Sequence, residues 1–270
     1  MFISRRSSLA ALAAAATSPI AAQAQPAQSD DDDDDKMPKA KIKLIALDVG
    51  GTLIQDHGEV PAALMGAFSR HGLTVTPAEI SVWRGASKRS LIQHFVELRG
   101  PAAGGPALTD AVFADFVAHA SKAYENVQPI AGAVDALKTL KTRGYVLATT
   151  TGFDRQLDDQ IMRHLGWHGY FVANITSDDV VDGRPSPFML FHAMEAARID
   201  DVTTVMAVGD TPLDLQAANN AGVGAAIGVY SGAATEDRLR RERSTGILPS
   251  VASLPALLEK GLPITQWRCR

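Results

Sequence analysis

The sequence predicts an α/β fold, a doubly wound parallel sheet with a small α-helical domain inserted into it. Four near-continuous apolar runs have the length and composition of strands that are covered on both faces. Between these runs, segments 130–141 and 189–197 carry apolar residues at helical spacing. Strands separated by helices favour parallel pairing with right-handed crossovers. The predicted strands cover residues 42–47, 145–149, 203–208 and 225–229.

One stretch interrupts this alternation of strands and helices. Between residues 58 and 127 the pattern predicts helices and no strand, with breaks at glycine and proline. We therefore expect a helical cap at 58–127 that divides the core into residues 37–57 and 128–262, followed by a tail at 263–270. The predicted helices of the cap cover residues 61–70, 87–98 and 109–124.

The first 36 residues resemble an export signal followed by an acidic linker. The apolar run is too short to remain in a membrane as a permanent span. We expect a periplasmic or secreted protein exported by the twin-arginine route. Translation starting at Met37 would instead leave the protein in the cytoplasm. The parts of the signal are Arg5 and Arg6, the apolar run 9–16, the small residues 22–24 and the acidic block 30–36.

Composition excludes several classes of function. The formal net charge is −4, so no basic surface for nucleic acid is expected. The single cysteine, Cys269, rules out an intrachain disulfide framework and a metal site built from cysteines. These features favour a small-molecule partner.

Polar residues follow the predicted strands at positions that suit phosphate and a metal ion. Asp48 is followed by Gly50 and Gly51, which allow backbone amides to approach an anion. Asp210 and Asp214 lie four residues apart, and Asp48 can reach the same point from a neighbouring strand. Three hard oxygen ligands suit Mg²⁺. The other two polar segments are 149–152, at the end of the second strand, and 183–185. In the latter, Pro185 is expected to open a helix.

In this order, the four segments resemble the four motifs of the haloacid dehalogenase superfamily. The resemblance implies that Asp48 is the nucleophile and forms an aspartyl intermediate, that Thr151 binds the phosphoryl group and that Arg184 neutralises it. Asp48, the carbonyl group of Gly50, Asp210 and Asp214 would hold Mg²⁺. The resemblance also places these residues against the substrate: Gly50, Gly51, Thr52, Arg84, Gly152 and Phe153.

Gly50 departs from the ordinary phosphatases of that superfamily, which have an aspartate there as general acid and base. General acid catalysis contributes typically about 10²–10⁴ in rate. The phosphonatase-like subfamily has a small residue at this position and uses a cap lysine that forms a Schiff base with the substrate. Residues 84–88, Arg-Gly-Ala-Ser-Lys, are similar to the lysine segment of that subfamily and make Lys88 the candidate amine.

Two other functions stay open from the sequence. One is a phosphoglycolate-type phosphatase that works without the aspartate, and the other is a phospho-metabolite binding protein with weakened catalysis. Gly58 and Leu91 stand where the subfamily has an active-site cysteine and a cap histidine, counted without gaps from the nucleophile. The resemblance also implies a homodimer that pairs through the cap.

Overall fold

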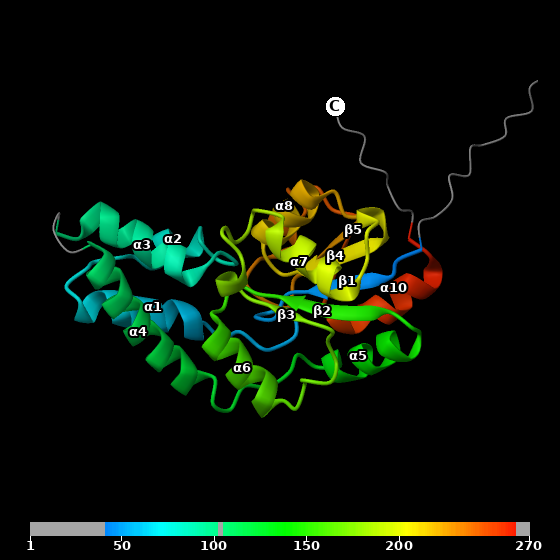
Figure 1. Cartoon of the computed structure of the whole chain (residues 1–270), viewed down its shortest axis with the longest axis horizontal. Helices are drawn as coiled ribbons and strands as arrows, with labels where there is room; N and C mark the ends of the chain where they lie inside the picture. Colours follow the sequence, from blue (N-terminus) through cyan, green and yellow to red (C-terminus); the bar gives the residue numbers. More distant parts are fainter. Residues whose placement is uncertain (1–40, 102–104, 263–270) are drawn as a thin grey trace, which may run out of the picture. The chain divides into compact units, whose positions relative to one another are not determined.

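The computed structural model describes residues 41–101 and 105–262 (Figure 1). Its sheet has six parallel strands in the order β3-β2-β1-β4-β5-β6, which confirms the predicted α/β class. The predicted export signal at 1–36 and the tail at 263–270 lie outside the described residues. The strands are β1 (Leu44–Leu47), β2 (Val146–Thr150), β3 (Asn174–Ile175), β4 (Val205–Gly209), β5 (Ala225–Val229) and β6 (Gly246–Leu248).

Helices cover both faces of the sheet, as a doubly wound fold requires. Ile45 and Leu47 of β1 point into one hydrophobic cluster, which α5, α6 and α10 share. Leu44 and Ala46 point into the cluster on the other face, which α7, α8 and α9 share. Because successive side chains of a strand alternate between faces, all four must be apolar. These helices are α5 (Ala133–Thr142), α6 (Arg155–His164), α7 (Phe188–Ala197), α8 (Pro212–Ala221), α9 (Glu236–Leu239) and α10 (Leu254–Lys260).

Four helices lie between β1 and α5 in the chain and together form the helical insert. Helices α1 and α3 both pack against α4, and Phe68 of α1 meets Phe95 of α3 edge to face at 5.6 Å. The sequence did not predict α2, because five residues are too few to show a period. Its capping box of Thr76 and Glu79 was the available signal. The insert consists of α1 (Glu59–Arg70), α2 (Pro77–Ser81), α3 (Lys88–Arg99) and α4 (Gly105–Ala123).

Two further details differ from the predictions. Strands β3 and β6 were not predicted, since they contain only two and three residues. Pro185 does not open a helix: its peptide bond with Arg184 is cis, and α7 begins at Phe188. The prediction for Pro185 was therefore wrong, because a turn separates it from the helix.

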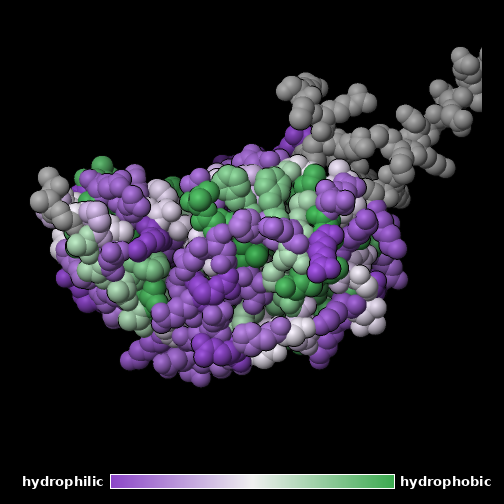
Figure 2. Space-filling model, in the orientation of Figure 1, coloured by the Kyte–Doolittle hydropathy of each residue, from purple (hydrophilic) through white to green (hydrophobic). Residues whose placement is uncertain are grey.

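The face of the molecule in Figure 2 is mostly hydrophilic, with hydrophobic residues gathered in separate patches. Exposed Val181, Phe188 and Phe191 belong to α7 and the loop before it. Across the described parts of the chain, every helix is too short or too polar to cross a lipid bilayer.

Candidate active site

Three adjacent strands end at the candidate site. Asp48 directly follows β1, Thr151 follows β2 and Asp210 follows β4, and all three residues are buried. Because β1 pairs with both β2 and β4, the parallel register brings the three residues to one edge of the sheet. This edge is where open α/β sheets bind their ligands.

Arg184 bridges two of the acidic side chains. Its Nη1 atom lies 2.8 Å from Oδ1 of Asp48 and 2.9 Å from Oδ1 of Asp214. Its Nη2 atom donates to the carbonyl oxygen of Thr150 at 2.6 Å and to the hydroxyl of Thr150 at 3.0 Å. Burial raises the pKa of Asp48 to about 6, and the charge of Arg184 opposes that rise. The guanidinium group is thus held firmly beside the predicted nucleophile.

Two of the four predicted metal ligands, Asp214 and Asp210, make different contacts. Asp214 accepts hydrogen bonds from the backbone N–H of Thr211 at 2.9 Å and from its hydroxyl at 2.6 Å, which caps α8. Asp210 accepts one from the backbone N–H of Ala233 at 2.5 Å. Within residues 41–101 and 105–262, no three acidic, histidine or cysteine side chains are grouped closely enough to hold a metal ion. Their role as ligands therefore stays a prediction.

Asp48 and Asp210 nevertheless suit a divalent cation. Burial raises the pKa of Asp210 well above its ordinary value, and repulsion from Asp48 and Asp214 raises it further. A Cβ atom at Gly51 would lie 2.4 Å from Oδ2 of Asp210, so only glycine allows the backbone this close. Buried carboxylates that repel one another are relieved by a cation, and their hard oxygen atoms fit Mg²⁺.

Lys88 is the first residue of α3, and its side chain is 7% exposed. Its Nζ atom donates to the carbonyl oxygen of Ala86 at 2.7 Å and lies 5.8 Å from the centre of the Phe153 ring. Burial lowers the pKa of Lys88 to about 8, while the negative charge of Asp48 counteracts that shift. An amine with this pKa is partly neutral near physiological pH and can act as a nucleophile.

Phe153 occupies the space beside Gly50. A Cβ atom at position 50 would lie 3.2 Å from Cζ of Phe153, closer than most such contacts. The ring is itself held edge to face against Tyr124, with 5.6 Å between ring centres. A longer side chain at position 50 would therefore displace the ring. This packing fits the absence of an acid at Gly50.

The segment before α3 lies directly on the loops of the core. A Cβ atom at Gly85 would lie 2.4 Å from the hydroxyl of Thr211, and one at Gly152 would lie 2.6 Å from the carbonyl oxygen of Ala86. Nη1 of Arg184 also donates to the carbonyl oxygen of Gly85 at 3.4 Å. These contacts bring Lys88 to the same site as Asp48.

Arg84 lies in the pocket wall and forms an ion pair with Asp56, with 3.3 Å between Nη1 and Oδ2. Sequence reasoning did not select Asp56 or Tyr124, which also line the pocket. Asp56 in a loop before Gly58 looks like an ordinary turn residue, and Tyr124 looks like a core residue at the end of a helix. Only the fold shows that both face a cavity.

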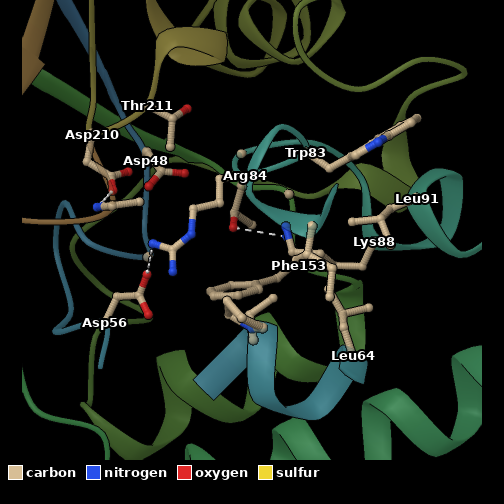
Figure 3. Close-up of a pocket in the computed structure, with 18 of the residues that line it drawn as sticks. Asp48, Asp56, Leu64, Trp83, Arg84, Lys88, Leu91, Phe153, Asp210 and Thr211 are labelled. Carbon is tan, nitrogen blue, oxygen red and sulfur yellow. Dashed lines mark hydrogen bonds and ion pairs between the residues drawn. The ribbon is translucent and has the colours of Figure 1, made fainter. Parts of the chain in front are cut away.

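Together these residues enclose a cavity of about 60 Å³, most of whose lining side chains are drawn in Figure 3. Gly51 and Thr52 were predicted to contact substrate, yet they do not line this cavity, and the buried hydroxyl of Thr52 has no hydrogen-bond partner. Asp214, a predicted metal ligand, does not line it either and instead contacts Arg184 and Thr211. The other predicted residues do line it. They are Asp48, Gly50, Arg84, Lys88, Thr151, Gly152, Phe153, Arg184 and Asp210.

Comparison with known families decides the class. The sequence profile described as haloacid dehalogenase-like hydrolase matches residues 42–222, well over half of the chain. The chain belongs to this family. It is therefore a haloacid dehalogenase-like hydrolase, in agreement with the class that the motifs predicted.

Several curated relatives of the hydrolase carry one name. It is 26% identical over 258 residues to phosphonoacetaldehyde hydrolase of Bacteroides fragilis, covering 81% of this chain and 96% of the relative. It is 29% identical over 259 residues to the enzyme of the same name from Lactiplantibacillus plantarum, covering 81% of this chain and 96% of that one.

Solved structures agree on the fold of the hydrolase. A phosphonoacetaldehyde hydrolase-like protein from Oleispira antarctica matches with a TM-score of 0.71 at 20% identity, covering 82% of this chain and 93% of that one. A predicted phosphoglycolate phosphatase from Haemophilus somnus matches with a TM-score of 0.69 at 19% identity, covering 80% of this chain and 98% of that one. At such identities the likeness supports the fold alone.

Proposed function

We propose that this hydrolase cleaves the P–C bond of a small phosphonate that carries a carbonyl group. Asp48 is the nucleophile, and Lys88 is the amine that forms an imine with the substrate. The observation that carries this proposal is the buried amine of Lys88 in the same cavity as Asp48. The names of the curated relatives point in the same direction.

In the proposed reaction, the neutral amine of Lys88 attacks the carbonyl carbon, and loss of water with uptake of one proton from solvent gives a protonated imine. Asp48 then attacks phosphorus, and the electron pair of the P–C bond moves into the imine to form an enamine. Protonation of the enamine and hydrolysis of the imine release the carbonyl product. Water hydrolyses the aspartyl phosphate. This route needs no acid at Gly50, where Phe153 limits the space for one.

The remaining groups would stabilise charge and hold the substrate. Asp48, Asp210, Asp214 and the carbonyl group of Gly50 would hold Mg²⁺, which would screen the repulsion between the nucleophile and the phosphonate. Thr151 lines the cavity, and Arg184 already lies within hydrogen-bond distance of Asp48. Phosphoryl transfer depends mostly on such positioning and charge stabilisation. The helical insert would serve as a cap that excludes water from the imine.

Borohydride trapping tests the role of Lys88. The protein is mixed with phosphonoacetaldehyde and sodium borohydride, and the modified peptide is located by mass spectrometry. We expect a reduced adduct on Lys88 in the wild type and in the control Lys122→Ala, an exposed lysine of the insert. Lys88→Ala should give no adduct and no phosphate. An adduct that persists in Lys88→Ala contradicts the proposal.

A panel of small phosphate esters and phosphonates separates the proposal from its alternatives. Inorganic phosphate released from phosphoglycolate at an equal rate in wild type and Lys88→Ala would indicate a phosphatase. Tight binding without release from any compound would indicate a binding protein. Phosphate released from a carbonyl phosphonate only when Lys88 is present supports P–C cleavage.

Export and pairing are also part of the proposal. We expect the mature protein to begin after residue 24 in the periplasm or outside the cell, which mass spectrometry of its N-terminus would test. Pairing through the helical insert predicts a dimer in sedimentation experiments.

A further inference from the structure

The cavity has two chemically different sides. In Figure 3, Asp48, Asp210 and Thr211 lie on one side, and Leu64, Trp83 and Leu91 lie on the other with Lys88 and Phe153. The apolar side receives residues from α1, α2 and α3, from the segments that follow α2 and α4, and from the loop after β2. Its lining residues are Val60, Pro61, Leu64, Ile80, Trp83, Leu91, Tyr124 and Phe153.

The amine of Lys88 lies at the border of the apolar side. Leu91 is three residues after Lys88 on α3, so the two side chains share one face of the helix. Leu64 of α1 and Ile80 of α2 are buried and line the same cavity. A substituent on a carbonyl carbon bound to Lys88 would therefore have the side chains of Leu64, Ile80 and Leu91 beside it.

An aldehyde would leave this hydrocarbon surface without a partner, because it places only a hydrogen atom there. An alkyl group would fill it and would be removed from water, which contributes about 0.8 kcal/mol per methylene. Leu64, Ile80 and Leu91 are buried and close the cavity on this side, which favours a short chain.

We propose that the substrate is a 2-oxoalkylphosphonate, a ketone whose alkyl chain of one to three carbons lies among Leu64, Ile80 and Leu91. This inference rests on the proposed function and specifies its substrate class. The overall reaction is R–CO–CH₂–PO₃²⁻ plus H₂O giving R–CO–CH₃ and HPO₄²⁻. The P–C bond breaks, its electron pair passes through the imine on Lys88, and water supplies the oxygen of phosphate and the proton of the methyl group.

A homologous series tests the inference on the full-length enzyme with Mg²⁺. Phosphate release is measured from phosphonoacetaldehyde and from 2-oxopropyl-, 2-oxobutyl-, 2-oxopentyl- and 2-oxoheptylphosphonate. We expect kcat/KM to rise roughly fourfold with each methylene up to 2-oxopentylphosphonate, which is about 0.8 kcal/mol per methylene. The value should fall at 2-oxoheptylphosphonate, because its chain exceeds the cavity.

Two variants locate the effect. Leu91→Asn should reduce the ratio of kcat/KM for 2-oxopentyl- over 2-oxopropylphosphonate to about one, since a polar wall no longer favours each methylene. Leu98→Asn changes an exposed residue of the same helix and should keep the wild-type ratio. The ratio is independent of the fraction of folded enzyme.

The outcomes separate this inference from the proposed function. Turnover of phosphonoacetaldehyde with a flat or falling ketone series overturns the inference and leaves the proposed function intact. Failure of every carbonyl phosphonate to release phosphate or to give a borohydride adduct on Lys88 overturns both.

Discussion

A side chain at position 50 and the ring of Phe153 compete for the same space, since a Cβ atom at Gly50 would lie 3.2 Å from Cζ of the ring. The ring also contacts Tyr124 and lies beneath the amine of Lys88. The same aromatic residue therefore limits the space for an acid next to the nucleophile and forms the floor under the candidate imine-forming amine.

Gly50→Asp should destabilise the protein by about 1–3 kcal/mol, because the new carboxylate overpacks the ring of Phe153. Urea unfolding measures the loss. The double variant Gly50→Asp, Phe153→Ala should recover part of the stability that overpacking removes. Its rate of phosphate-ester hydrolysis should be about 10²-fold higher than that of the wild type, as expected of a restored general acid. Gly169→Asp, at an open position, is the control for the single change. Equal stability of the two single variants would contradict the packing argument.

Arg184→Met should lower the free energy of unfolding by about 3 kcal/mol and abolish activity, because Asp48 and Asp214 then lose the cation between them. Arg184→Lys should retain part of the stability, since it keeps the charge but not both contacts to Thr150. Arg240→Met removes an exposed ion pair with Glu236 and should cost less than about 0.5 kcal/mol. Denaturant unfolding compares the three variants, and equal losses would refute the bridging role.

Mg²⁺ should raise the melting temperature of the wild type, because a cation that binds only the folded state stabilises it, by about 2.7 kcal/mol at 100 times Kd. Asp210→Asn should reduce this rise strongly. Asp237→Asn, an exposed residue of α9, should show the wild-type shift. Differential scanning calorimetry with and without Mg²⁺ measures the effect, and an unchanged shift in Asp210→Asn would exclude that residue as a ligand.

The rate of imine formation should follow the protonation of Lys88. Only the neutral amine attacks a carbonyl group, and burial lowers the pKa of Lys88 from 10.5 to about 8. The rate should therefore rise tenfold per pH unit below pH 8 and level off above it. Single-turnover trapping with borohydride at pH 6 to 9.5 measures the profile. A rise that continues toward pH 10 would mean that the amine is solvated.

Asp158 of α6 should make stability depend on pH. Its carboxylate is fully buried without a hydrogen-bond partner, and Nη1 of Arg155 is 4.0 Å away. Burial raises the pKa of Asp158 to about 7, with Asp159, Asp179 and Asp154 adding repulsion. The folded state then binds the proton more tightly than the unfolded state, so stability falls as pH rises from about 4 to 7.

Asp158→Asn removes that penalty. We expect the free energy of unfolding to rise by about 1–2 kcal/mol at pH 8. The rise should be smaller at pH 5, where the wild-type carboxyl of the folded state is protonated. Asp200→Asn, an exposed carboxylate outside this cluster, should show no such difference between the two pH values. Urea unfolding at both pH values gives the comparison, and an equal gain at each would point to a cause other than titration.

The sequence predicted the strands that are longest and most buried, because a parallel strand covered on both faces is a continuous apolar run. It also located the four polar segments, since each follows a strand or carries an unusual cluster of charge, glycine and proline. Strands β3 and β6 and helix α2 escaped prediction because two to five residues are too few to establish a period.

The sequence by itself determined the order of the motifs, the family and the identity of Asp48, Arg184 and Lys88 as candidates. Only the tertiary structure decided that Arg184 pairs with both Asp48 and Asp214, and that Phe153 fills the space beside Gly50. These contacts join residues that lie from 30 positions apart, for Arg184 and Asp214, to 136 positions apart, for Arg184 and Asp48. Their geometry depends on how the chain packs, so no local pattern encodes it.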